Sequence, residues 1–314
     1  MPAFADSVSL KSLAVQDPPG YVFLCGGKLT DLDHSLRAQF YERRVKPDPI
    51  LARRVKLAEV ADEWYSTRKL FDNLLELEEC LAGLSACILL FVESPGAIAE
   101  LGAFSQMLQL RQKLLVVVEQ SHFRQSSFIR NGPLEQLFQM DEKCLLPYPW
   151  LVDLAGGGSK VIDPATLDAV LDGIARALAE TLAAKRKTIP FDTDDVGHKM
   201  LLVTDLVKLG VVSQQKELLE TLRELGTKIE KRSLVKYLYL LEQLELVVSL
   251  PYGHNVFYVS PVGTRDHIRY AHKDPAIPLD RIKLRGLLHK DFPPNDEKRE
   301  AFDAFWRRGG GVAP

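Results

Sequence analysis

The chain of 314 residues contains few cysteines and few histidines, four and seven respectively. No two cysteines form a C-x-x-C pair and no histidines cluster, which excludes the common structural zinc motifs and a disulfide framework. No apolar run reaches the roughly 18 residues that a membrane-spanning helix needs, and the N-terminus lacks the basic start and apolar stretch of a signal peptide. These absences predict a reduced, cytoplasmic protein with no metal and no membrane partner.

Charge of one sign is also lacking, because 40 Lys and Arg residues stand against 42 Asp and Glu residues. A surface coated entirely by nucleic acid is therefore excluded, and any basic patch must be local. The apolar fraction of 46% is typical of globular proteins. The length suffices for about two domains of ordinary size.

The stretch from residue 80 to residue 109 is the most informative part of the sequence. Its apolar run at 86–92 predicts a strand buried on both faces. Ser94 and Pro95 then favour a helix start, because the serine hydroxyl can cap a free N–H and proline costs nothing at the first helical position. Ligands bind at the carboxyl ends of strands in open parallel sheets. We therefore expect Ser94 and Gly96 to shape a substrate-binding turn.

Glu100 is the candidate catalytic residue of this helix. At about 100° per residue, it falls opposite a polar face that contains Ser105, Gln106 and Gln109. A carboxylate on the apolar side of a helix is costly unless it is paired or used. A buried ion pair remains an alternative interpretation, whereas stabilisation by the helix dipole fades after the first turn.

Further apolar runs at 21–25, 114–118 and 144–146 predict additional strands. Gly26 and Gly27 follow the first of them and would let the backbone approach a ligand, although a simple turn needs the same residues. The segments with helical patterns are residues 32–44, 49–67, 70–84 and 164–185. Alternating strands and helices predict an α/β fold with a Rossmann-like, flavodoxin-like parallel sheet flanked by helices.

Two groups of polar residues, one in the segment 119–137 and one in the helix at 70–84, each allow more than one interpretation. The segment 119–137 is interpreted as a loop, in which Arg130 and Asn131 could hold phosphate or ribose hydroxyls or could simply stabilise the loop. The acidic residues of the leucine-rich helix are interpreted as a solvated face rather than as a second catalytic carboxylate. They are Glu76, Glu78 and Glu79.

A second domain begins after a linker at residues 188–195. Three helical patterns, at 198–209, 213–225 and 229–244, precede two short alternating strands around a hairpin tip. Three helices followed by a hairpin predict a winged helix-turn-helix domain. The domain boundaries are predicted as 1–190 for the sheet domain, 196–273 for the winged helix and 274–314 for a C-terminal tail.

The third helix of this domain begins with basic residues, which would suit phosphate contacts in a nucleic-acid groove. Many winged helices only mediate protein contacts, and a basic helix face is often simply solvated. The tail carries Arg281, which makes a docking arm conceivable. The candidate DNA-binding residues are Lys228, Lys231, Arg232 and Lys236.

The run ILLFVESPGAIAELGAFS at residues 88–105 resembles the strand, turn and catalytic helix of nucleoside deoxyribosyltransferase-like proteins. It is most similar to one branch, the retron effectors that carry a winged-helix domain behind the ES-x-G-x-x-AELGAF pattern. SSFIRNGP at 126–133 extends the resemblance less specifically. The resemblance implies that Glu100 attacks the sugar of a nucleotide substrate.

The resemblance also implies a role as the toxic effector of a retron anti-phage defence system. The expected activity is that of an N-glycosidase acting on NAD or a related nucleotide, with no cofactor. The implied partners are a retron reverse transcriptase and its multicopy branched DNA, with which the protein would form an oligomeric complex. The alternatives are a nucleotide-sensing DNA-binding regulator and a nucleoside deoxyribosyltransferase.

Overall fold

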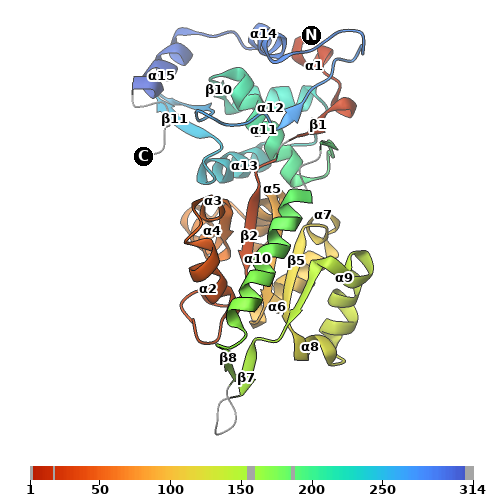
Figure 1. Cartoon of the computed structure of the whole chain (residues 1–314). Coiled ribbons are helices and arrows are strands. Elements are labelled where there is room, and N and C mark those ends of the chain that lie inside the picture. The colour runs from red at the N-terminus through yellow and green to blue at the C-terminus, as the bar shows by residue number, and fades with distance from the viewer. Residues whose placement is uncertain (1–2, 17, 154–159, 185–187, 308–314) are drawn as a thin grey trace. The chain divides into compact units, whose positions relative to one another are not determined.

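The computed structural model describes residues 3–16, 18–153, 160–184 and 188–307 (Figure 1). The chain divides into two compact units, each with its own hydrophobic cluster. The sheet unit comprises residues 19–185, and the helical unit comprises residues 1–18 together with residues 186–314. Within the described ranges, no helix combines the length and the apolar character needed to cross a bilayer.

Five parallel strands form the core of the sheet unit, in the order β3-β2-β4-β5-β6. Because the first of these strands lies second in the sheet, this is the 2-1-3-4-5 order of flavodoxin-like doubly wound folds. The predicted parallel sheet is therefore confirmed. The strands are Tyr21–Cys25 (β2), Val55–Leu57 (β3), Ser85–Val92 (β4), Leu114–Glu119 (β5) and Leu145–Tyr148 (β6).

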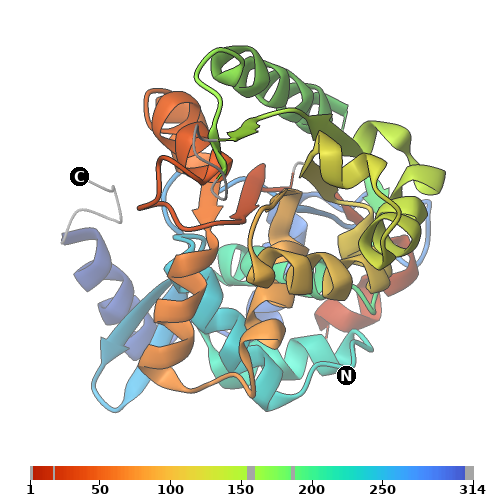
Figure 2. The ribbon, with the colours of Figure 1, turned by 90° about the horizontal axis from the view of Figure 1, so that it is seen from below.

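Helices cover both faces of this sheet (Figure 2). α2 (Leu36–Phe40) and α10 (Leu167–Ala184) pack on one face, against alternate strand residues such as Leu89. α5 (Leu74–Leu84) and α6 (Pro95–Gln106) lie against β4 on the other face. Burial on both faces explains why the strands are almost continuously apolar.

The helix start after β4 is formed as predicted. Ser94 has an extended backbone, and its hydroxyl accepts a hydrogen bond from the Ala97 N–H at 3.1 Å. Pro95 takes the first helical position, where no donor is needed. α6 ends at Gln106, and a short helix, α7 (Leu108–Arg111), precedes β5.

The continuous helix predicted over residues 49–67 is wrong, because β3 interrupts it. α3 (Pro49–Arg54) ends where β3 begins, and α4 (Ala58–Arg68) follows directly. The predicted helix over residues 32–44 is likewise divided, into α2 and a π-helical turn at Tyr41–Val45. Val55 pairs with Val22 of β2, and this non-local pairing outweighs the local helical pattern.

The loop predicted over residues 119–137 is wrong, because most of this segment is helical. A hairpin of β7 (Leu151–Asp153) and β8 (Lys160–Ile162) follows β6 outside the main sheet. The helical segments between β5 and β6 are α8 (Gln120–Arg124), a π-helical turn η3 (Arg130–Leu134), α9 (Glu135–Met140) and a 3-10 turn (Glu142–Cys144).

The helical unit contains the predicted series of three helices and a hairpin. The helices are α11 (Val196–Gly210), α12 (Gln215–Glu224) and α13 (Lys231–Gln243). The hairpin strands β11 (Val248–Tyr252) and β12 (Asn255–Val259) meet at Gly253, whose positive φ of 58° suits the turn. A short strand, β10 (Ser213–Gln214), pairs with the other side of β12.

The first 18 residues group with the helical unit, although the predicted boundaries place them in the sheet domain. β1 (Ala14–Val15) pairs with β9 (Ile189–Pro190) and β13 (Ile268–Arg269). α1 (Ala3–Ser7) buries Phe4, whose ring contacts that of Tyr270 edge to face. A 3-10 turn at Leu10–Ser12 joins these elements. Pairing and burial thus give the segment a structural role that its local pattern did not indicate.

The predicted tail is also integrated into the helical unit. It forms α14 (Arg281–Asp291) and α15 (Asp296–Arg307). Asp291 accepts hydrogen bonds from the Ala3 and Phe4 N–H groups at 2.6 and 2.8 Å, so the end of α14 is joined to the start of α1. α15 packs on the hairpin strands β11 and β12.

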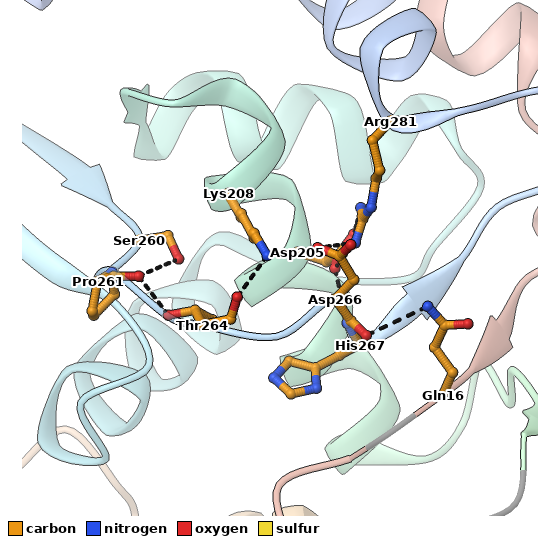
Figure 3. A network of polar contacts seen from close by, with 9 residues as sticks. All are labelled: Gln16, Asp205, Lys208, Ser260, Pro261, Thr264, Asp266, His267 and Arg281. Carbon is orange, nitrogen blue, oxygen red and sulfur yellow. Dashed lines mark hydrogen bonds and ion pairs between the residues drawn. The ribbon is translucent and has the colours of Figure 1, made fainter.

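A group of charged residues, called here the Asp205 cluster, holds α14 in place (Figure 3). It consists of Asp205, Lys208, Asp266 and Arg281. The Arg281 guanidinium contacts the buried Asp205 and the Asp266 carboxylate, each at 2.7 Å. Lys208 contacts Asp266 at 2.6 Å. Arg281 therefore serves an internal contact in this structure and is not displayed as part of a docking arm.

Candidate active site at the carboxyl edge of the sheet

The carboxyl ends of β2 and β4 form the topological switch point of the sheet. From β2 the chain proceeds to β3 on one side, and from β4 it proceeds to β5 on the other. Gly26 and Gly27 follow β2, and Glu93 and Ser94 follow β4. Ligands of doubly wound folds bind in the crevice at such a point, so the fold brings these predicted residues to the expected place.

Glu93 joins the two loops at this edge. Its Oε1 atom accepts hydrogen bonds from the Gly27 N–H at 3.0 Å and the Ser35 hydroxyl at 2.6 Å. The same carboxylate accepts from the N–H groups of Leu36 and Arg37 at 2.8 and 3.2 Å, at the start of α2. Burial raises the pKa of Glu93 above its ordinary value even though these donors favour the charged form.

Close packing around Gly26 and Gly27 leaves no room for a side chain at either position. Gly26 has a φ of 149°, and a Cβ there would lie 2.8 Å from the Phe91 Cβ and 2.9 Å from the Arg37 Cδ. A Cβ on Gly27 would lie 2.7 Å from the Glu93 Oε1. Because Glu93 accepts the Gly27 N–H, that donor is occupied in this structure. Ligand binding by either glycine stays a prediction.

Arg37 supports the same turn from beneath. Its guanidinium is only 1% exposed and donates to the Gly27 and Leu24 carbonyl oxygens at 2.8 and 2.9 Å. Two further hydrogen bonds of 2.6 Å join it to Glu59. Burial tends to raise the pKa of Glu59, but the hydrogen bonds and charge of Arg37 outweigh it and lower this pKa. No local sequence pattern indicates the roles of Glu93, Arg37 and Glu59, because their partners are 10 to 66 residues away along the chain.

Glu100 lies in the second turn of α6, behind the Ser94 cap. Its side chain is half-buried, and its Oε2 atom is shielded from solvent. Burial raises the pKa of the Cys25 thiol at the end of β2, and the negative charge of Glu100 adds to this rise. The Glu100 carboxylate is therefore close enough to β2 to affect the Cys25 thiol. The predicted division of α6 into an apolar and a polar face is wrong at Ser105, which is fully buried.

Glu78 of α5 is a second carboxylate in this region. It is 7% exposed, so the solvated face predicted for the acidic residues of α5 is wrong at this position. Its charge also raises the pKa of Cys25, after the effects of burial and Glu100. The spacing carries a signal, since Glu78 is four residues after Leu74 and three before Leu81, on the apolar stripe of α5.

Arg130 and Asn131 make contacts within their own segment. Arg130 donates to Glu135 at 2.6 Å and stacks 4.6 Å above the Phe123 ring centroid. The Asn131 amide donates to the Ser126 hydroxyl at 3.0 Å. These contacts give both residues a stabilising role in the helical segment after β5. The predicted contacts to phosphate or ribose stay untested.

Three of the four basic residues predicted to bind DNA are exposed at the start of α13. Lys228 precedes the helix, and Lys231 and Arg232 occupy its first turn. Lys236 is only 5% exposed, which makes it the least accessible of the four. Glu230 adds one exposed acidic group between them. The exposed basic group is therefore Lys228, Lys231 and Arg232.

The sheet order defines a doubly wound α/β protein. Its candidate site contains three carboxylates, those of Glu78, Glu93 and Glu100. The family model described as "STM3845 retron effector protein" matches residues 33–249, which is more than half of the chain. The chain therefore belongs to this family of retron effectors. The match extends from the loop before α2 to the first hairpin strand of the helical unit.

Two curated proteins of Escherichia coli are similar to this chain. One, named "Retron Ec73 putative ribosyltransferase/DNA-binding protein", is 28% identical over 242 residues, which are 72% of this chain and 74% of that protein. The other, named "Retron Ec86 putative ribosyltransferase/DNA-binding protein", is 34% identical over 134 residues. That match covers 40% of this chain and 39% of the relative.

Proposed function

We propose that this retron effector is an N-glycosidase that cleaves the N-glycosidic bond of NAD or a related nucleotide, with Glu100 as the nucleophile. The observation that carries the proposal is the Glu100 carboxylate, half-buried at the switch point of the sheet on the helix that follows the Ser94 cap. The ribosyltransferase name of both relatives supports the same class of chemistry. The sheet unit would correspond to the nucleoside deoxyribosyltransferase-like domain.

The reaction would proceed through an oxocarbenium-like state at the anomeric carbon of the ribose. The Glu100 carboxylate bonds to this carbon while the bond to the nicotinamide nitrogen breaks, and the bonding electron pair leaves with the nitrogen. Nicotinamide departs neutral, so no general acid is required. Water then attacks the same carbon, releases the carboxylate and gives its proton to solvent. Glu78 would accept hydrogen bonds from the sugar hydroxyls.

In the helical unit, we propose a winged helix that binds the branched DNA of the retron. Three helices followed by the β11–β12 hairpin support this assignment. The exposed Lys228, Lys231 and Arg232 would contact phosphates, while the buried Lys236 would not. Membership of the retron effector family supports a partnership with a reverse transcriptase and this DNA, in an oligomeric complex that controls a toxic activity.

The enzymatic proposal is tested by incubating the purified protein with NAD and with nucleosides, with and without the reverse transcriptase and branched DNA. Nicotinamide and ADP-ribose are the expected products. Glu100→Gln should lower the rate at least about 1,000-fold, because the amide keeps the size but is not a nucleophile. Glu180→Gln, an exposed position on α10, is the matched control and should keep full activity.

Other outcomes of this experiment would contradict the proposal. Full activity in Glu100→Gln would remove the assigned nucleophile. Transfer of a deoxyribosyl group to a second base would favour the nucleoside deoxyribosyltransferase. DNA binding without any turnover would favour the nucleotide-sensing regulator.

The DNA-binding proposal has its own test. Reversing both charges in Lys231→Glu/Arg232→Glu should weaken binding and flatten the salt dependence by about two counterions, since each lost phosphate contact removes roughly 0.9 from the slope. Lys216→Glu/Arg223→Glu changes the same charge at exposed positions of α12 and is the control. Turnover by the isolated variant should be unchanged. Normal DNA binding by Lys231→Glu/Arg232→Glu would assign the interface to another surface.

A further inference from the structure

A recess lies on the other side of α6 from Glu100. It has a volume of about 370 Å³ and opens at the carboxyl ends of β4 and β5. Its walls include the apolar side chains of Ile98, Val118, Ile129 and Leu134, and its rim includes His122 and Gln125. Ligand pockets of proteins usually measure about 300 to 1,000 Å³ and combine apolar walls with a few polar groups. The recess therefore has the size and composition of a small-molecule site.

The chemistry of the walls favours a neutral ring over a phosphate. No Lys or Arg belongs to the described residues that line the recess. Glu93 borders it, but its carboxylate is held by the donors at the start of α2. Ile98 is 42% exposed at the mouth, which leaves apolar surface for a ligand to cover. A heteroaromatic ring with hydrogen-bonding edges would satisfy both the walls and the rim.

The position of the recess relative to Glu100 follows from helix geometry. Ile98 and Glu100 are two residues apart, which is about 200° around the helix axis. The recess and the carboxylate thus lie on opposite sides of the start of α6. Gly96 is exposed on the Glu100 side of the helix start, four residues before Glu100, and a Cβ there would meet only the Ser94 hydroxyl at 3.9 Å, so the helix start leaves space on that side. A single nucleoside is too short to reach both sides, whereas a dinucleotide can extend around the helix start.

We propose that this recess binds the second base of a dinucleotide, the base that is not cleaved, and that the substrate class is therefore dinucleotides. This inference rests on the proposed glycosidase function. Within the recess, the side chains of Ile98, Ile129 and Leu134 contact the faces of the base. The polar edge of the ring faces His122 and Gln125. The ribose that carries the scissile bond lies on the Glu100 side.

The test fills the recess from its exposed mouth. Ile98→Trp should raise the KM for NAD at least about tenfold while kcat changes less than about twofold, because it removes binding remote from the reacting carbon. Cleavage of nicotinamide mononucleotide, which lacks the second base, should keep its kcat/KM. Ala179→Trp adds the same side chain at an exposed position of α10 that does not line the recess, and it should affect neither substrate. Equal losses for both substrates, or no change for NAD, would overturn the proposal.

A binding measurement separates this inference from the proposed activity. Calorimetry with adenosine monophosphate and the Glu100→Gln protein should show binding that Ile98→Trp abolishes and Ala179→Trp preserves. If the protein cleaves no nucleotide and yet shows this pattern, the glycosidase proposal fails while the base site stands. If adenosine monophosphate does not bind, or binds equally well in Ile98→Trp, the base site is refuted whatever the activity.

Discussion

Charged side chains are buried in both units, but the two units arrange them in opposite ways. In the helical unit, the Asp205 cluster matches two carboxylates with two cations. Around Cys25 in the sheet unit, the negative charges of Glu100 and Glu78 each raise the thiol pKa more than the positive charge of Arg37 lowers it. The Asp205 cluster thus pairs its opposite charges, whereas near Cys25 the negative charges have the larger effect on the thiol.

The difference suggests two roles for buried charges: those of the Asp205 cluster stabilise the fold, and those near Cys25 serve the candidate site. A matched group recovers the cost of burial through its ion pairs and hydrogen bonds. Carboxylates near a buried thiol disfavour its thiolate form, and groups with perturbed pKa values occur preferentially at functional sites. Glu93 belongs with the first kind despite its place at the sheet edge, because four protein donors surround it.

The largest expected effect on stability is in the Asp205 cluster. Asp205→Ala should lower the free energy of unfolding of the helical unit by about 3–5 kcal/mol, because it leaves Arg281 without its buried partner. Urea unfolding measures the change. The double variant Asp205→Ala/Arg281→Met should recover part of the loss. A loss below about 1 kcal/mol would mean that the balance of this cluster does not stabilise the unit.

Acid should weaken the same cluster. Burial tends to raise the pKa of Asp266, but its hydrogen bond with Lys208 and the charge of Arg281 lower it overall. The contribution of Asp266 is therefore present above the unfolded-chain pKa of about 3.9 and is lost as the pH falls through the lower folded-state pKa. Asp266→Asn should flatten the decrease of the unfolding midpoint in this acidic range. An unchanged pH profile would contradict this role.

Glu93→Gln should have the next largest effect, a loss of about 1–3 kcal/mol in the stability of the sheet unit. The four groups that hydrogen-bond to the carboxylate are all donors, and the amide group of glutamine would face some of them with its own N–H. Thermal unfolding followed by circular dichroism measures this loss. Glu76→Gln on α5 is an acid-to-amide control outside the switch point.

Glu100→Gln should change stability least among the buried carboxylates, by less than about 1 kcal/mol, since it removes one of the like charges around Cys25. The comparison is sharpest when activity is measured on the same samples. A protein that unfolds like the parent but has lost turnover would assign Glu100 to function. Destabilisation as large as that of Asp205→Ala would make Glu100 a structural residue.

The sequence predicts the features that neighbouring residues determine, and it misses those that depend on residues far apart in the chain. The β4 strand, the Ser94 cap and the start of α6 are encoded by neighbouring residues, and all three are found. β3 was missed because three residues carry too little periodicity, and its stability comes from pairing with β2. A helical wheel could have identified Glu78 as buried, because its spacing matches the apolar stripe.

The roles of Glu93 and Arg281 required the tertiary structure. Glu93 meets its partners from a distance of 56 to 66 residues along the chain, and Arg281 meets Asp205 across 76 residues. No local pattern predicts such partners. For the same reason, the sequence assigned the first 18 residues to the sheet domain, whereas the pairing of β1 with β9 and β13 places them in the helical unit.

The smallest expected effect concerns an unbalanced region on the surface of the helical unit. At the hairpin tip, the Tyr252 hydroxyl donates to Glu300 at 2.5 Å and the Asn255 amide donates to Glu297 at 2.7 Å. The hydrogen bond to Glu300 raises the pKa of Tyr252. Two carboxylates of α15 therefore stand beside a hairpin that, in a DNA-binding winged helix, would approach phosphates.

Glu297→Gln/Glu300→Gln should strengthen binding to branched DNA by about two- to fivefold at low salt, because two negative charges beside the hairpin no longer oppose the phosphates. The gain should vanish near 1 M salt, where the screening length is only about 3 Å. Asp303→Asn, an exposed change on the same helix away from the hairpin contacts, should have a smaller effect. An equal gain in affinity per removed charge in Asp303→Asn and in Glu297→Gln/Glu300→Gln would show that only the net charge of α15 matters. Weaker binding in the double variant would mean that α15 positions the hairpin for DNA instead of opposing it.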